Sequence, residues 1–301
     1  MMTCLDIGGS GIKGAVAGGV ADIEMLGRLR TPLDDFEAFV GAIEEMLVLS
    51  PAPAGSAVSI AITGVVDPAD EVIKCANIPC IDGRRLAPEL RRRLGRPVAV
   101  ANDADCFALA EAVAGAGKGH RIVFGTILGT GVGGGLVIDG RMIVGAGGFA
   151  GEWGHGPIAA TEVGAPPVAI PRFPCGCGQV GCLDTVGAAR GMERLHRHLH
   201  GLTLDSVEIV AAWGRGDAAA SRTIDCYVEL VAAPLALVVN VVGAGIVPVG
   251  GGLGKSAALI GRLDAEVRKR ILRRTDGPLV VQAQLDIEPG LVGAAILGGA
   301  S

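Results

Sequence analysis

The chain has 301 residues, 50% of them hydrophobic and 19% charged, which excludes a disordered chain and allows a large buried core. A formal net charge of −5, without a long basic run, argues against nucleic acid or an anionic membrane as the main partner. The 49 glycines have no collagen-like period and gather in short runs after apolar segments, where a backbone often comes close to a phosphate.

The first part of the chain predicts an α/β domain that opens with a hairpin. Residues 3–7 and 12–17 have strand patterns, and the glycine-rich turn 8–11 separates them. Apolar residues at helical spacing predict a helix over 36–47, with Asp34 or Asp35 as its N-cap. Further strands are predicted at 58–62 and 98–101, and further helices at 86–94 and 104–114.

The same plan starts again at residue 122. A strand at 122–128, a glycine turn at 129–135 and a hairpin of strands at 136–138 and 142–144 open this second part. Helices are then predicted at 188–200, 205–213, 218–241, 257–271 and 291–297, and strands at 246–249 and 279–283. Two parts that open alike predict two similar α/β domains facing a cleft. We expect these domains at residues 1–118 and 119–287, with a C-terminal helix at about 288–301 returning to the first.

The N-terminus has neither a basic segment nor a long apolar segment, so we do not expect a signal peptide. A cytoplasmic location and reduced or metal-bound cysteines are therefore expected. Residues 231–250 are uncharged and long enough to span a bilayer. They contain Pro234, Asn240 and Pro248, and a buried helix, a turn at 243–245 and a core strand fit this pattern better than a membrane span.

Three glycine motifs are candidates for phosphate binding. Gly129, Gly131 and Gly134 have the dinucleotide spacing, but a strand and an Asp-Gly turn follow them where that motif needs a helix. The sequence from Gly250 to Ser256 ends like a P-loop that would use Lys255, but Val249 stands where that loop needs its first glycine.

The third motif is the N-terminal turn that begins at Asp6. Its backbone N–H groups and the Ser10 hydroxyl can meet a phosphate, and Asp6 can hold Mg²⁺ through water. Each motif alone could be a plain tight turn. Three such turns, each ending a core strand, favour a shared nucleotide site.

Cys175, Cys177 and Cys182 lie within eight residues of a glycine-rich knuckle, so their thiols can converge. Three thiolates and one imidazole make a closed tetrahedral set suited to structural Zn²⁺, and reduced buried cysteines are the alternative. His196 and His200 share a helix face, but an exposed basic helix is favoured there over a metal site. We interpret Trp153 as a packing residue, and the remaining cysteines as core or near-core thiols: Cys4, Cys75, Cys80, Cys106 and Cys226.

In chain order, the segments LDIGGSGIK, CANIP, ANDADCFALAEA, ILGTGVGGGL, GEWGH, CGCGQVGCLD and VPVGGGLG resemble the ROK family (repressors, open reading frames, kinases) over almost the whole length. Within that family, the chain looks most like the bacterial N-acetyl-D-glucosamine kinases. The resemblance implies an actin-like ATPase (ribonuclease H-like) fold and an ATP-dependent sugar 6-kinase that uses ATP, Mg²⁺ and structural Zn²⁺. It also implies a homodimer.

The resemblance implies roles for individual residues. Asp103 would be the catalytic base that accepts the proton of the sugar 6-hydroxyl as its oxygen attacks the γ-phosphate; from the residues alone, Asp103 could equally be a helix N-cap. His155 would be the fourth zinc ligand. The implied sugar contacts are Asn77, Asn102, Asp103, Glu152, His155 and Asp184. The implied ATP contacts are Asp6, Gly8, Gly9, Ser10, Gly11, Thr130, Gly131, Val132, Gly133, Gly134, Gly251 and Gly252.

Three positions depart from the family pattern: Asp184 replaces a glutamate, Asp105 replaces an asparagine, and Gly11 replaces a basic or polar residue. The first two concern the choice of sugar, and the alternatives to N-acetyl-D-glucosamine are glucose, N-acetylmannosamine and fructose. Lys13 is not assigned to phosphate. A non-catalytic sugar sensor is a further alternative, but family repressors carry an extra N-terminal DNA-binding domain, and the strand predicted from the third residue is expected to leave no room for one.

Overall fold

A computed structural model describes residues 1–285 and 288–299. Contacts divide the chain into two compact units: unit 1 comprises Met1–Gly115, Gly140–Ala150 and Leu285–Ser301, and unit 2 comprises Ala116–Asp139 and Gly151–Gln284. Segment 140–150, expected in the second domain, therefore groups with unit 1. Residues 286–287 of the expected second domain and residues 300–301 of the expected C-terminal helix lie outside the described residues.

Unit 1 is built on a mixed five-stranded sheet of order β3-β2-β1-β4-β7. Its strands are β1 (Met2–Gly8), β2 (Gly11–Gly19), β3 (Asp22–Leu29), β4 (Val58–Ile62) and β7 (Val98–Asn102). Strand β1 is antiparallel to β2 and parallel to β4, which is parallel to β7. All five residues of β4 are buried, as expected for a central strand covered on both faces.

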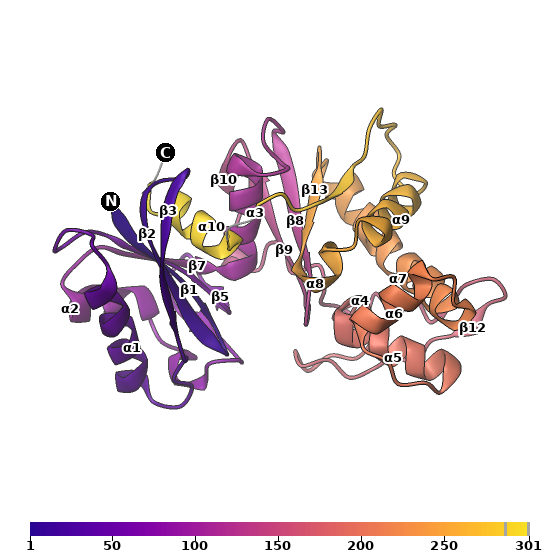
Figure 1. Ribbon diagram of the computed structural model, residues 1–301, viewed down its shortest axis with the longest axis horizontal. Coiled ribbons are helices and arrows are strands. Elements are labelled where there is room, and N and C mark those ends of the chain that lie inside the picture. The colour runs from indigo at the N-terminus through magenta and orange to yellow at the C-terminus, as the bar shows by residue number, and fades with distance from the viewer. Residues whose placement is uncertain (286–287, 300–301) are drawn as a thin grey trace. The chain divides into compact units, whose positions relative to one another are not determined.

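Four helices cover this sheet: α1 (Phe36–Leu49), α2 (Leu86–Leu94), α3 (Asp103–Ala114) and α10 (Pro289–Leu297). Asp35 caps α1, because its carboxylate accepts the N–H groups of Glu37 and Ala38. The last helix, α10, packs against α3 and β1 (Figure 1). A Cβ on Gly293 would lie 2.0 Å from the carbonyl oxygen of Cys106, so this glycine permits the close packing of α10 on α3. The short elements are β5 (Val65–Val66), β6 (Ile73–Lys74), β10 (Arg141–Met142) and two 3-10 helices, Pro79–Ile81 and Ala146–Gly148.

The strands of unit 2 run in the order β9-β8-β13-β14. They are β8 (Ile122–Leu128), β9 (Val132–Ile138), β13 (Val247–Gly250) and β14 (Val280–Gln282), and β13 is parallel to β8 and β14. Two short strands, β11 (Glu162–Val163) and β12 (Val168–Ala169), pair separately.

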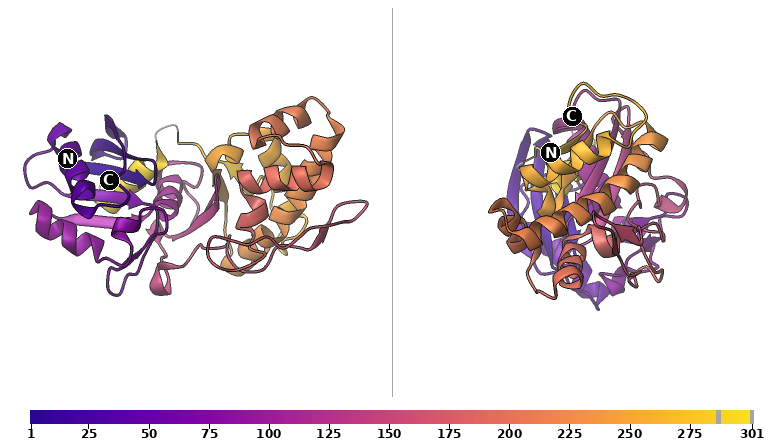
Figure 2. Two further views of the ribbon diagram at one scale, coloured as in Figure 1. Left: turned by 90° about the horizontal axis from the view of Figure 1, so that it is seen from below. Right: turned by 90° about the vertical axis from the view of Figure 1, so that its right-hand side faces the viewer.

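The helices of unit 2 are α4 (Asp184–Gly187), α5 (Ala189–His200), α6 (Ser206–Gly214), α7 (Ala218–Val242), α8 (Gly251–Gly254) and α9 (Ala257–Arg268). Helices α5 and α6 pack on α7, and the left-hand view of Figure 2 shows these salmon to orange helices grouped together. Tyr227 of α7 is fully buried, and its hydroxyl donates to the carbonyl of Gly187.

Within the described residues, α7 is the one helix long and apolar enough to cross a membrane. Of its apolar 18-residue stretch, 61% is buried inside the protein. It ends at Val242, the C-cap residue Gly243 has left-handed backbone angles, and the next strand begins at Val247. The buried helix, turn and core strand expected for residues 231–250 are therefore present, and the burial is typical of a core helix.

Two expectations about the strands and turns were wrong. Strand β3 was not predicted, because this edge strand has no buried residue and so lacks an apolar pattern. The expected turn 129–135 is shorter, because residues from Val132 onward belong to β9. A Cβ on Gly134 would lie 2.8 Å from the Trp153 ring, so the glycine makes room for this side chain, which is buried as expected.

The sequence favoured an exposed basic helix for the segment that contains His196 and His200. The structure shows instead that helix α5 is partly buried. His196 is fully buried, and its Nδ1 lies 2.8 Å from the hydroxyl of Thr223. That hydroxyl donates to the carbonyl of Ala219, so it accepts its second hydrogen bond from Nδ1–H of His196. The rings of His196 and His200 lie 5.0 Å apart.

Candidate functional site

In unit 1, the candidate residues lie at the carboxyl ends of three neighbouring parallel strands. These strands end at Gly8, Ile62 and Asn102, and the register pairs Ile7 with Ile62 and Ile62 with Asn102, so they end at the same edge of the sheet. The carboxyl edge of a parallel sheet is the usual place for ligands in open α/β folds. The N-terminal turn lies beside Asn77, because a Cβ on Gly9 would be 3.3 Å from the carbonyl oxygen of Asn77.

Asn102 and Asp103 stand where β7 passes into α3. Oδ1 of Asn102 accepts the N–H groups of Ala104 and Asp105, and Nδ2 donates to the carbonyl of Gly64. Both ends of the Asn102 side chain thus have protein partners, and its contact with a sugar stays a prediction. Asp103 occupies the first turn of α3, where the helix dipole favours a carboxylate.

Asp6 lies near the end of β1, and burial raises the pKa of its carboxyl group above the ordinary value. The Lys13 ammonium lies 3.9 Å from this carboxylate and 2.8 Å from that of Glu288. Lys13 therefore pairs with carboxylates, which agrees with leaving it unassigned to phosphate.

Arg28 was missed by sequence reasoning. It comes from the unpredicted strand β3, and its guanidinium donates to the Ser10 hydroxyl at 3.2 Å. A Cβ on Gly11 would lie 2.5 Å from Nε of Arg28, so the guanidinium fills the space that a side chain at position 11 would take. This contact places a cation at the N-terminal turn, and only a prediction of β3 and its register could have found it.

In unit 2, two glycine turns meet at the carboxyl ends of β8 and β13. Gly251 has a φ of +81°, and a Cβ there would lie 2.6 Å from the backbone of Leu128. The next residue, Gly252, is exposed, as is Thr130 of the first turn. Helix α8 begins at Gly251 itself and the exposed Lys255 follows its end, so no P-loop is formed, as expected. The Gly129 motif leads into strand β9 and therefore does not form the dinucleotide motif either.

His155, Cys175, Cys177 and Cys182 converge, and their ligand atoms all lie within 4.8 Å of one another. Sγ of Cys177 and Cys182 are 3.6 Å apart, and Sγ of Cys175 is 3.6 Å from Nδ1 of His155. Bonds of about 2.3 Å to sulfur in tetrahedral geometry require sulfur atoms about 3.8 Å apart, so the four residues fit Zn²⁺.

The ionisation of the three thiols is uneven. Burial raises the pKa of Cys175 to about 12, whereas a hydrogen bond from the backbone of Gln179 lowers the pKa of Cys177 to about 7. A bound cation would favour the thiolate form of all three.

The carboxylate of Glu152 lies 3.7 Å from Nε2 of His155, so Glu152 extends this cluster through that imidazole. Burial raises the pKa of Glu152, the charge of Asp184 raises it further, and His155 lowers it. A carboxylate that faces the second nitrogen of a ligating histidine orients that ring. Asp184 lies at the start of α4, and its carboxylate accepts the N–H of Val132 at 2.8 Å.

The ROK family model matches residues 2–300. An N-acetylgalactosamine kinase of Shewanella sp. (strain ANA-3) is 36% identical over 98% of this chain and 95% of its own. An N-acetyl-D-glucosamine kinase of Escherichia fergusonii is 34% identical over 97% of each chain.

The chain belongs to the ROK family. Its structure resembles the ROK glucokinase of Streptomyces griseus in complex with glucose and AMPPNP, with a TM-score of 0.78, 28% identity and 98% of both chains covered. The ROK hexokinase of Thermus thermophilus matches with the same TM-score at 29% identity. The expected actin-like ATPase fold is thereby confirmed.

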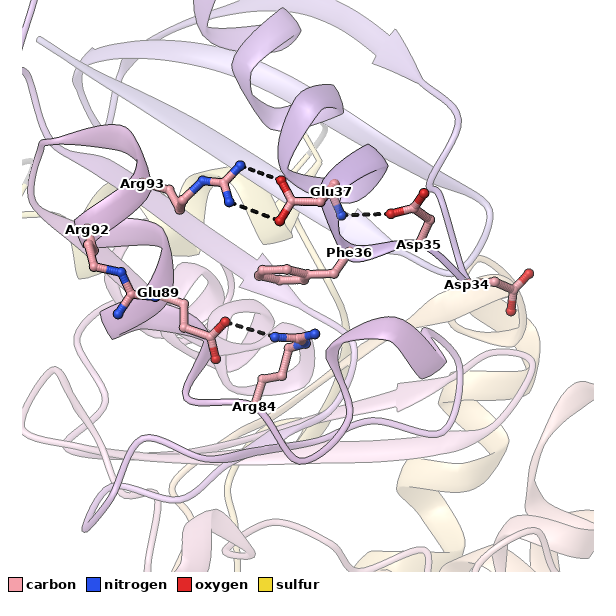
Figure 3. Close-up of a pocket in the computed structure, with 8 residues that line it drawn as sticks. All are labelled: Asp34, Asp35, Phe36, Glu37, Arg84, Glu89, Arg92 and Arg93. Carbon is pink, nitrogen blue, oxygen red and sulfur yellow. Dashed lines mark hydrogen bonds and ion pairs between the residues drawn. The ribbon is translucent and has the colours of Figure 1, made fainter.

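This ROK protein also has a charged hollow of about 500 Å³ in unit 1, between the start of α1 and α2 (Figure 3). The guanidinium of Arg84 lies 4.0 Å from the ring centre of Phe36, and Arg93 pairs with Glu37. The hollow is lined by Asp34, Asp35, Phe36, Glu37, Arg84, Glu89, Arg92 and Arg93, none of which is a predicted site residue.

Proposed function

We propose that the protein is a cytoplasmic sugar kinase that transfers the γ-phosphate of ATP to the 6-hydroxyl of N-acetyl-D-glucosamine. The observation that carries this proposal is the position of Asp103, a carboxylate in the first turn of α3 at the same sheet edge as the N-terminal glycine turn. Membership of the ROK family and relatives named as amino-sugar kinases support it.

Asp103 accepts the proton of the attacking hydroxyl, which makes the oxygen a better nucleophile. Phosphoryl transfer otherwise depends on positioning and on charge neutralisation. Asp6 would hold the Mg²⁺ that accompanies ATP, and the turn at Gly8–Gly11 presents backbone N–H groups to the phosphates. The Arg28 guanidinium adds positive charge at the same turn.

In unit 2, the turns at Thr130–Gly134 and Gly251–Gly252 contact the nucleotide. Glu152 and His155 hold the sugar, and Zn²⁺ bound by His155 and the three cysteines would stabilise the fold of the segment that carries them. The ring of His155 links the two tasks, since its nitrogens face Cys175 and Glu152.

A second candidate substrate is N-acetyl-D-galactosamine, because one relative at 36% identity is named as a kinase for that sugar. The two sugars differ only in the configuration of the 4-hydroxyl. Discrimination between them therefore depends on hydrogen bonds to one group.

The test is the rate of ADP release with saturating ATP and Mg²⁺ and a panel of sugars: N-acetylglucosamine, N-acetylgalactosamine, N-acetylmannosamine, glucose and fructose. We expect the highest kcat/KM with N-acetylglucosamine. A higher kcat/KM for another sugar would make that sugar the substrate. Absence of sugar-dependent ADP release with every sugar in the panel would refute the kinase activity. Sedimentation of the purified protein tests the expected homodimer.

A further inference from the structure

Asp184 replaces a glutamate at a position for which the family resemblance implied a sugar contact. Its surroundings in unit 2 indicate another task. Oδ1 accepts the backbone N–H of Val132 at 2.8 Å, and Oδ2 lies 3.9 Å from Sγ of Cys175. Oδ1 of this half-buried carboxylate therefore has a backbone partner within unit 2, and Oδ2 faces the cysteine cluster.

The contact with Val132 fixes the end of a glycine turn. In this turn the N–H of Gly129 donates to the carbonyl of Gly131, and β9 begins at the next residue. A Cβ on Gly131 would lie 2.9 Å from Oδ1 of Asp184, which is closer than such contacts normally come. The absence of a side chain at Gly131 thus leaves the space that the Asp184 carboxylate occupies.

The backbone of Asp184 is fixed as well. Its N–H donates to the carbonyl of Gly154, within the segment that carries Glu152 and His155. A Cβ on Gly154 would in turn lie 2.6 Å from the carbonyl oxygen of Val132. Asp184 therefore joins the glycine turn, the Glu152–His155 segment and the cysteine knuckle in one closely packed cluster.

We propose that Asp184 is a positioning residue that holds the Gly129–Val132 turn in place for the nucleotide, and that it is not a sugar ligand. This inference rests on the proposed function, because it takes the turn to be part of the ATP site. A hydrogen bond to a charged acceptor within a packed cluster is strong enough to select one conformation of a glycine-rich turn. The aspartate suits this task, since its short side chain reaches the N–H of Val132 while its own backbone N–H is bound to the carbonyl of Gly154.

Three substitutions at position 184 separate the two roles. Asp184→Ala removes the acceptor, and we expect binding of AMPPNP with Mg²⁺ to weaken about five- to tenfold, with N-acetylglucosamine binding within about twofold of wild type. Asp184→Asn keeps an acceptor for the N–H of Val132 and should keep most nucleotide affinity. Asp184→Glu should weaken nucleotide binding, whereas a sugar ligand of the family type would tolerate it. Asp217→Ala, which removes an equally short carboxylate–backbone bond to Ala220 in unit 2, is the control.

A double-mutant cycle tests the contact itself. Gly131→Ala should weaken nucleotide binding in the wild-type background, because the new methyl group meets Asp184. In the Asp184→Ala background the same substitution should have a much smaller effect. An equal effect in both backgrounds would mean that the methyl group at position 131 acts on nucleotide binding independently of Asp184. That result would overturn the proposed coupling.

Calorimetric binding of each ligand and the zinc content of each variant complete the experiment. The proposal is overturned if Asp184→Ala weakens sugar binding and spares AMPPNP. It is also overturned if Asp184→Ala loses its zinc and binds AMPPNP no worse than metal-free Cys182→Ser, because loss of the metal would then explain the whole effect. Failure of the wild-type protein to bind AMPPNP or any sugar would instead refute the proposed kinase function.

Discussion

Asn102 caps helix α3 through its side chain, while Asp103 is the first residue of that helix. Capping was the structural alternative to catalysis for Asp103, and Asn102 meets that need by accepting two backbone N–H groups. One oxygen of Asp103 also accepts the N–H of Ala104, at 2.9 Å. The carboxylate is thus held at the helix start next to a separate cap.

Asp103→Asn should therefore remove activity without unfolding the protein. We expect kcat to fall by about 10²–10⁴-fold, because the amide cannot accept the hydroxyl proton, and sugar binding to persist. Initial rates and calorimetry measure the two effects. Asp139→Asn, at an exposed turn with left-handed backbone angles that asparagine tolerates, is the control. A variant rate close to wild type would rule out Asp103 as the base.

Substitution of one zinc ligand should release the metal. We expect about one zinc ion per wild-type chain by elemental analysis, and little in Cys182→Ser, with a lower thermal midpoint. Because binding requires thiolates, metal retention should weaken as the pH falls. Cys80→Ser changes a half-buried thiol outside the cluster and should keep the metal. Wild-type protein without metal, and unaffected by a chelator, would contradict the zinc site.

The two glycines that follow β13 should respond differently to alanine. Gly251→Ala places a methyl group against the Leu128 backbone at a positive φ, so we expect a loss of at least about 1–2 kcal/mol in the free energy of unfolding. Gly252→Ala has open space around its Cβ and should lose nothing. Denaturant unfolding of both variants makes the comparison, and equal stabilities would contradict the described contact.

The buried His196 should make stability depend on pH. Burial lowers its pKa below the ordinary value of 6.5, so the unfolded chain takes up a proton first as the pH falls. The free energy of unfolding should then decrease below about pH 6.5, by at most about 1.4 kcal/mol per pH unit. His196→Gln should reduce this slope, while His198→Gln on the exposed face should leave it unchanged. Equal slopes for all three proteins would contradict this assignment.

Arg28→Gln should raise the KM for ATP about three- to tenfold and leave the KM for the sugar unchanged. The substitution removes a cation from the turn proposed to hold the phosphates. Arg30→Gln, an exposed neighbour, serves as the control. An increase in the sugar KM alone would place Arg28 elsewhere in the reaction.

Elements with continuous apolar runs could be predicted from the sequence. Residues 58–62, 86–94 and 122–128 have the bounds expected, because buried strands and amphipathic helices leave a clear period. Strand β3 could not be found, since an exposed edge strand has no such pattern. The burial of His196 depends on its packing against Thr223, twenty-seven residues away, which no local pattern shows.

The features of the candidate site also divide into those that the sequence could predict and those that it could not. The convergence of the three cysteines follows from their spacing, and the resemblance supplied His155. The partners of Arg28 and Asp184 lie 18 and 52 residues away, so they depend on strand register and tertiary packing. Sequence reasoning therefore located the chemical groups better than it located what holds them.

The division of the chain into units has a practical consequence. Three separate segments make up unit 1 and two make up unit 2, so neither is encoded by one uninterrupted stretch. A fragment ending at residue 118 would lack α10, whose buried Leu291, Ala294 and Ala295 pack with Cys4 and Cys106. Such a truncation would expose that apolar surface to solvent and aggregate on expression. Independent production of either half requires a rearranged gene that reconnects its segments.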